Sequence, residues 1–60
     1  MDEKLKATEC CRMLQEFAQI LKSESYELYE EGRVRESRRA EKKYLTVIEA
    51  RDILRIRYSL

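Results

Sequence analysis

The stretch YELYEEGRVRES, residues 26–37, decides the fold of this 60-residue chain. It contains Gly32, the only glycine in the sequence, and the chain has no proline. Glycine adopts left-handed backbone conformations without a steric penalty, so it often follows the last residue of a helix. The residues on either side of Gly32 indicate whether a helix ends there.

The leucine spacing changes phase at this glycine. Before it, leucines recur every seven residues, as they do along one face of a helix: Leu14, Leu21 and Leu28. The same spacing continued past Gly32 reaches only charged residues: Arg35, Lys42 and Glu49. One unbroken helix would therefore turn its apolar face to water in its second half. We expect a single domain over residues 1–60, with helices at about 2–30 and 35–58 and a turn at about 31–34.

Composition favours the same all-α fold. Charged residues make up 42% of the chain and hydrophobic residues 43%, a mixture typical of long amphipathic helices. Strands need turn residues that this sequence lacks. We therefore expect an antiparallel two-helix hairpin that completes a four-helix bundle by dimerisation or by binding a partner.

Apolar residues follow helical spacing in both halves of the chain. In the first half they are Ala7, Cys10, Cys11, Leu14, Phe17, Ala18, Leu21 and Leu28. In the second half they are Val34, Ala40, Tyr44, Val47, Ile48, Leu54 and Tyr58. On the first helix, we expect the hairpin to be held together by Leu14, Phe17 and Leu21. The pattern weakens at Glu24 and Ser25, where we expect the helix to present a polar edge.

The second helix carries more apolar surface than a hairpin needs. Its apolar positions cover an arc of about 200°, while one core-facing stripe needs about 100°. Leu45, Ile53 and Ile56 would be exposed in a lone hairpin, and exposed apolar patches usually mark interfaces. A second copy of the chain would cover them in a two-fold four-helix bundle. A larger partner protein that supplies the missing helices would cover them equally well.

Eight residues are predicted to form this protein interface: Tyr44, Leu45, Ile48, Ile53, Ile56, Tyr26, Arg51 and Arg55. Tyrosine is favoured at interfaces because its ring combines an apolar body with a polar end. For Tyr26, which lies off the apolar stripe, plain exposure is an equal alternative. Arg51 and Arg55 project into the apolar arc, where their stems cover the core or their guanidinium groups pair with acids of a partner.

Charge is separated between the two halves. Residues 1–31 hold eight acids and four bases, while residues 32–60 hold nine bases and four acids. In a hairpin the acidic end of the first helix lies beside the basic start of the second, and we expect part of the charge to be compensated there. One ridge of the second helix could instead follow a nucleic-acid backbone, and it consists of Arg35, Arg38, Arg39 and Lys42.

Nothing in the sequence indicates catalysis. The chain has no histidine, no glycine-rich phosphate loop and no nucleophile motif. Cys10 and Cys11 are adjacent, which is not a metal-ligand spacing. We expect no catalytic, cofactor or metal site and no small-molecule substrate.

The sequence also indicates where the chain resides. Its first residues, MDEKLKATE, are acidic and lack the apolar segment of a secretory signal. No apolar run approaches the roughly 18 residues of a membrane span. These features predict a cytoplasmic protein that does not bind membranes.

Residues 26–37 resemble the inter-helix turn of tetratricopeptide hairpins. The matching features are Tyr29, Gly32 and the pair Glu36 and Ser37, where that family commonly has Glu-Ala. The resemblance implies a helix–turn–helix at this point in the chain. No second repeat, tryptophan or closing proline accompanies it, so it does not imply membership of the family.

The sequence therefore predicts a small non-enzymatic interaction protein, such as a regulator, an adaptor or a co-chaperone. It would act through a helical apolar seam shared with itself or with a larger protein, while charges select the partner. The alternative is a dimeric nucleic-acid-binding regulator that uses the basic ridge of the second helix.

Overall fold

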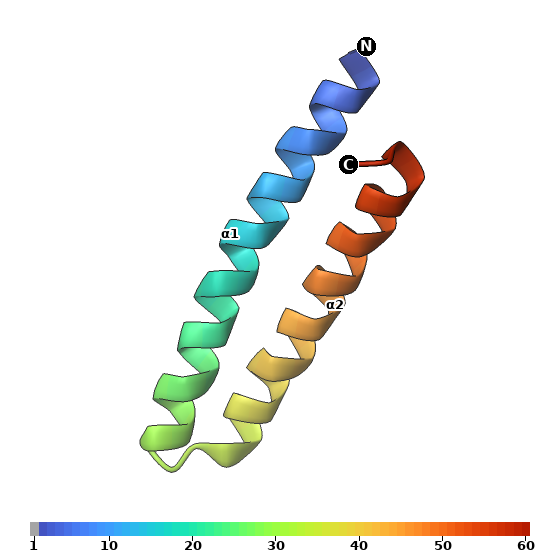
Figure 1. The fold of residues 1–60 in the computed structure, drawn as a ribbon. Helices are drawn as coiled ribbons and strands as arrows, with labels where there is room; N and C mark the ends of the chain where they lie inside the picture. The colour runs from blue at the N-terminus through green and yellow to red at the C-terminus, as the bar shows by residue number, and fades with distance from the viewer. Residues whose placement is uncertain (1) are drawn as a thin grey trace.

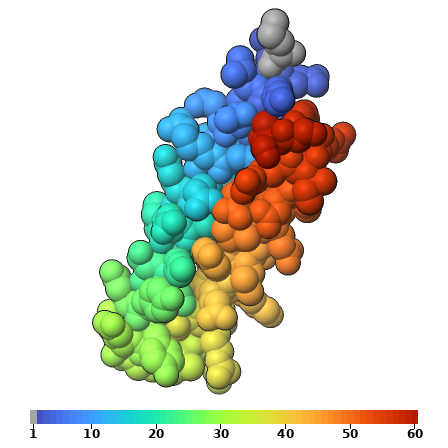
Figure 2. Space-filling model, viewed as in Figure 1, coloured from blue at the N-terminus to red at the C-terminus, as the bar shows by residue number. Residues whose placement is uncertain are grey.

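A computed structural model describes residues 2–60 as two long helices packed side by side (Figure 1). Helix α1 spans Asp2–Glu30, helix α2 spans Val34–Tyr58, and the two run antiparallel. The molecule is elongated, with Cα extents of 47 × 14 × 11 Å, and the helices lie against each other along its length (Figure 2). The predicted all-α hairpin is confirmed. Met1, which the predicted domain includes, lies outside the described residues.

The turn between the helices is a glycine-dependent helix cap. Gly32 has a φ of 81°, in the left-handed region. Its N–H donates to the carbonyl of Tyr29 at 3.0 Å, and the N–H of Arg33 donates to the carbonyl of Leu28 at 2.9 Å. These two bonds form a Schellman motif, which satisfies carbonyl groups that the end of α1 leaves without helical partners. Gly32 therefore ends α1 as its place in the sequence predicts.

Helix α2 begins without a side-chain cap. Arg33 precedes it with φ −88° and ψ 65° and makes no capping side-chain bond. Its carbonyl accepts the N–H of Ser37 at 2.9 Å, which starts the helical ladder. The last turn carries Arg55 and Arg57, cations that suit the negative end of a helix. Of the two helix ends at the turn, only the C-terminal end of α1 is therefore capped.

Side chains with heptad spacing form the contact between the helices, which is called the seam below. From α1 the seam takes Ala7, Cys11, Leu14, Ala18, Leu21, Ser25 and Leu28. From α2 it takes Ser37, Ala40, Tyr44, Val47, Arg51, Leu54 and Tyr58. These positions alternate in steps of three and four, and all are buried or half-buried. The pattern is that of an antiparallel coiled coil, in which the seven-residue repeat keeps one narrow stripe facing the other helix.

The two helices lie close together at the seam, because much of the seam consists of small side chains. Its buried hydrophobic residues are three alanines and one leucine: Ala7, Ala18, Leu21 and Ala40. Near the turn, Ser25 Oγ donates to the carbonyl of Ser37 at 3.2 Å, and Ser37 Oγ donates to the carbonyl of Ser25 at 2.8 Å. A serine hydroxyl is short, so these bonds require the two backbones to lie close together.

Two predictions about the core are wrong. Phe17, expected to hold the hairpin together, is 48% exposed, and Ser25, expected on a polar edge, is only 9% exposed. Where the backbones approach closely the seam has room only for small side chains, and a serine whose hydroxyl is bonded fits there. Phe17 precedes Ala18 in the chain and is therefore rotated from it by about 100° around α1. Its ring lies outside the seam for that reason.

Candidate protein–protein interface

Much of the apolar surface of this hairpin lies outside the seam. The exposed large hydrophobic residues are Leu5, Met13, Phe17, Ile20, Tyr26, Tyr29, Val34, Leu45, Ile53, Ile56 and Leu60. Single exposed apolar residues are common on proteins, whereas contiguous patches mark interaction sites. The arrangement of these residues on the two helices decides which of them form patches.

Four residues of α1 form an apolar stripe beside the seam, called the Phe17 stripe below: Cys10, Met13, Phe17 and Ile20. They are three, four and three residues apart, so they share one side of the helix. Around α1, Cys10 and Phe17 lie about 80° from the centre of the seam, and Met13 and Ile20 lie about 130° from it. The predicted apolar pattern of the first half combined this stripe with the seam, because both have the same heptad period.

The Phe17 stripe faces the same side of the molecule as three apolar residues of α2. Glu24 continues the spacing of the stripe, and it lines a surface depression with Arg39 and Lys43 of α2. Because these three residues line one depression, the side of α1 that carries the stripe lies next to the side of α2 that carries Arg39 and Lys43. Farther along the same side of α2 lie Ala50 and, at the edge of the seam, Val47 and Leu54, all half-buried. The stripe and these three residues together are called the Phe17 face.

Three of the predicted interface residues meet on the other side of the molecule. Tyr26, Tyr44 and Leu45 line a shallow depression together with Lys22, Ser25 and Glu41. The Lys22 Nζ atom lies 5.9 Å from the centre of the Tyr44 ring, a cation–π geometry that covers part of this ring. Ile48 is half-buried and follows Leu45 by three residues, so it extends the same side of α2.

The remaining apolar residues predicted on α2 are separated from that group. Ile56 and Arg55 line a depression at the C-terminal end of the helix with Asp52, Ser59 and Leu60. Ile53 is also exposed, and it is rotated from Leu45 by about 80°, because eight residues turn through about 100° each. The structure therefore distributes these residues over several places instead of one patch.

Arg51 is engaged within the hairpin. Its side chain is 20% exposed, and its Nη2 and Nε atoms donate to Asp52 Oδ1 at 2.9 and 3.2 Å. Its Nη1 atom donates to Gln15 Oε1 on α1. The thiol of Cys11 lies 3.8 Å from the Arg51 carbonyl oxygen. The guanidinium group thus bridges the two helices through Gln15, a residue that the apolar pattern did not single out.

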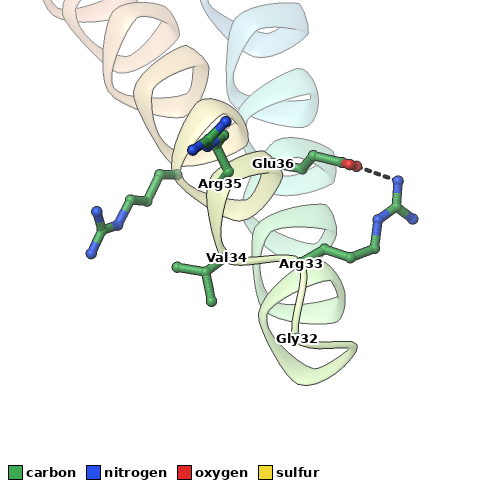
Figure 3. Close-up of a pocket in the computed structure, with 6 residues that line it drawn as sticks. Gly32, Arg33, Val34, Arg35 and Glu36 are labelled. Carbon is green, nitrogen blue, oxygen red and sulfur yellow. Dashed lines mark hydrogen bonds and ion pairs between the residues drawn. The ribbon is translucent and has the colours of Figure 1, made fainter.

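The four residues of the basic ridge are all exposed: Arg35, Arg38, Arg39 and Lys42. Within residues 2–60, the ion pairs at the turn belong to Arg33, which pairs with Glu31 at 3.4 Å and with Glu36. Figure 3 shows Arg33 and Glu36 pointing toward one another. The hydrogen bond and the charge of Glu36, and then those of Glu31, raise the pKa of Arg33. Charge compensation across the turn therefore forms at Arg33 and leaves the ridge free to contact solvent or a ligand.

Among residues 2–60, no three metal-ligating side chains come together, and neither helix is long and apolar enough to span a membrane. No protein-family model, curated protein or solved structure matches the chain.

Proposed function

We propose that this chain is a non-enzymatic protein–protein interaction module, a regulator, adaptor or small co-chaperone that docks through its apolar surface onto other helices. A second hairpin, from the same or another protein, would complete a four-helix bundle. The observation that carries the proposal is the imbalance between interior and surface. Within residues 2–60 the buried hydrophobic residues are one leucine and three alanines, while Met13, Phe17, Ile20 and Leu45 are exposed.

The small size of the chain makes this imbalance important. Chains below about 70–80 residues rarely obtain enough stability from their own core, and they usually add disulfides, a metal or another chain. Both cysteines of this chain are free thiols. Helices that cover Met13, Phe17 and Ile20 would remove apolar surface from water, which contributes about 25 cal/mol per Å². Association with other helices would therefore supply stability that the chain's own small core does not.

Sedimentation and denaturation test the proposal. We expect a species heavier than one chain at micromolar concentration. We also expect a urea midpoint that rises with protein concentration, because association stabilises the folded state by mass action. A cooperatively folded monomer whose midpoint is independent of concentration contradicts the proposal.

One observation favours a second function, nucleic-acid binding. The basic ridge is exposed, and in the part of the chain that the structure describes the ion pairs at the start of α2 involve Arg33 instead. Cations three and four residues apart along one helix can follow a phosphate backbone. The near-neutral net charge of +1 weakens this alternative, because it supplies little long-range attraction to nucleic acid.

Binding to duplex DNA and RNA over a salt series tests the second function. If the ridge binds phosphates, affinity falls as salt rises, and it falls further in a variant with Arg35→Ala, Arg38→Ala and Arg39→Ala. The matched control replaces three exposed cations of α1, with Lys4→Ala, Lys6→Ala and Arg12→Ala, and so removes the same charge. No binding at low salt, or equal losses in both variants, excludes the ridge as the site.

A further inference from the structure

We infer that the Phe17 face binds a second copy of this chain, with the two α1 helices packed antiparallel and a two-fold axis at the level of Gln15. This inference rests on the proposed function and deepens it, because it names both the partner and the surface. The Phe17 stripe of each chain lies against the Phe17 stripe of the other.

The order of residues along the stripe supports two-fold pairing. Met13 and Phe17 lie two residues before and after Gln15. Cys10 and Ile20 lie five residues before and after the same point. A two-fold axis at this level therefore places Phe17 against Met13 of the second copy, and it places Ile20 against Cys10. Each member of the stripe meets another member, which is the self-complementarity that an isologous interface requires.

The charges at the two ends of the stripe support the antiparallel direction. Lys6 lies nine residues before Gln15 and Glu24 nine residues after it. The two are eighteen residues apart, five full turns, so both lie on the side of α1 that carries the stripe. Antiparallel packing brings Lys6 of each copy to Glu24 of the other. Parallel packing would bring like charges together at both ends.

A different two-fold arrangement, with α1 against α2 of the second copy, places like charges together at the end of the molecule that holds the termini. Ser25 lies opposite Ser37 in the hairpin, so Lys6 and Arg57 lie at the same level. That arrangement would bring these two cations together at the end of the molecule that holds the termini. The antiparallel pairing of α1 with α1 places opposite charges at both ends of the stripe.

The side of the molecule that carries the Phe17 face is long enough for a dimer contact. With Cα extents of 47 × 14 Å, that whole side has roughly 650 Å² of flat area, so two chains that pack along its full length would bury about 1,300 Å² together. Specific protein interfaces bury about 1,200–2,000 Å² in total. Val47, Ala50 and Leu54 continue the apolar surface from α1 onto α2, so both helices contribute to the contact.

Disulfide trapping tests the pairing directly. In a Cys11→Ser background, the Ile20→Cys variant has one thiol at Cys10 and one at position 20. These thiols lie ten residues apart on α1, about 15 Å along its axis, and one disulfide spans at most about 7 Å between Cα atoms. No bond can therefore form within a chain. Oxidised glutathione accepts the two electrons and two protons of each thiol pair. We expect a covalent dimer with two disulfides, each joining Cys10 of one chain to the cysteine at position 20 of the other.

The matched control is Leu45→Cys in the same Cys11→Ser background. Leu45 is exposed but lies on the other side of the molecule, so we expect this variant to run as a monomer on a non-reducing gel. Ile20 is exposed as well, so its replacement removes no contact of the seam. Circular dichroism verifies that both variants keep the helix content of the wild type.

Charge reversal gives an independent readout. We expect Glu24→Lys to raise the dimer dissociation constant severalfold, and Lys6→Glu added to it to restore the wild-type value. Equal trapping in the Leu45→Cys control, or no restoration, overturns the antiparallel pairing. A sedimenting dimer that gives no trapped product overturns this inference and leaves the proposed function standing, whereas a stable monomer overturns both.

Discussion

Ser25 and Ser37 show how single residues set the distance between the helices. Each hydroxyl donates to the backbone carbonyl of the other serine, and the two Oγ atoms lie 3.3 Å apart. Among the described residues, no buried side-chain polar atom is left without a partner. Such a reciprocal pair also fixes the register, because a slide of one helix breaks both bonds together.

Two substitutions of Ser25 test separately the loss of its hydrogen bond and the lack of room for a larger side chain. Ser25→Ala is expected to lower the free energy of unfolding by about 0.5–1.5 kcal/mol, because the Ser37 carbonyl loses a donor. Ser25→Val is expected to lower it by about 1–3 kcal/mol, because the added methyl groups force the backbones apart. Urea denaturation followed by circular dichroism at one protein concentration measures both.

The control for this pair is Ser23→Val, at an exposed position of the same helix. It makes the same chemical change outside the seam, so its effect is expected within about 0.5 kcal/mol. If Ser25→Val and Ser23→Val have equal stability, the helices do not approach each other at Ser25 as described.

At the scale of the elements, α1 carries two neighbouring heptad patterns, the seam and the Phe17 stripe. The hairpin uses the first, along which small side chains and the bonded pair Ser25 and Ser37 let the two backbones lie close together. A two-helix unit can cover each helix on one side only, so the second pattern is left on the surface.

The cap should be sensitive to the residue at position 32. No heavy atom outside the chain neighbours of Gly32 lies within 4 Å of an added Cβ, so a substitution there tests backbone strain alone. Gly32→Ala is expected to lower the free energy of unfolding by about 1–2 kcal/mol, because alanine disfavours the left-handed conformation. Gly32→Asn is expected to lower it less, because asparagine tolerates positive φ.

Thermal and urea denaturation of the two Gly32 variants provide the measurement. Alanine has the higher helix propensity, so a ranking by propensity alone would place Gly32→Ala above Gly32→Asn. The cap reverses this order. Equal stability of wild type and Gly32→Ala would show that the left-handed conformation at position 32 is not required.

At the scale of the whole molecule, a pair of helices has too little interior for its apolar residues. Burial in the seam is complete only for small residues and Leu21. Met13, Phe17 and Ile20 are exposed, and residues 2–60 contain no third helix to cover them. The stability of the molecule is therefore expected to depend on its assembly.

Replacement of Phe17 tests this dependence. Phe17→Ser is expected to weaken dimerisation by about 2 kcal/mol, because aromatic residues near the centre of an interface contribute most of its energy. Sedimentation equilibrium measures the dissociation constant. Leu5→Ser is the control, since Leu5 is more exposed in the hairpin than Phe17 but lies off the Phe17 face. If the two variants dissociate equally, the Phe17 face is not the interface.

Several features of this protein follow from the sequence by itself. The phase change of the leucine spacing and the single glycine predict two helices and the place of the turn, because helical periodicity and the conformational freedom of glycine are local properties. The surplus of apolar residues on α2 is also visible in the sequence. Leu45, Ile53 and Ile56 are exposed in the hairpin, because their spacing places them outside the stripe of α2 that faces α1.

Only the tertiary structure decided which apolar residues of α1 face α2. The stripes through Leu14 and through Phe17 have the same period and lie side by side, so spacing cannot rank them. The outcome depends on how closely two backbones approach, which the reciprocal bonds of Ser25 and Ser37 make possible. The contact between Arg51 and Gln15 likewise joins residues far apart in the chain. Such contacts form only once the helices are aligned, so they belong to the pairing of the helices and not to either helix alone.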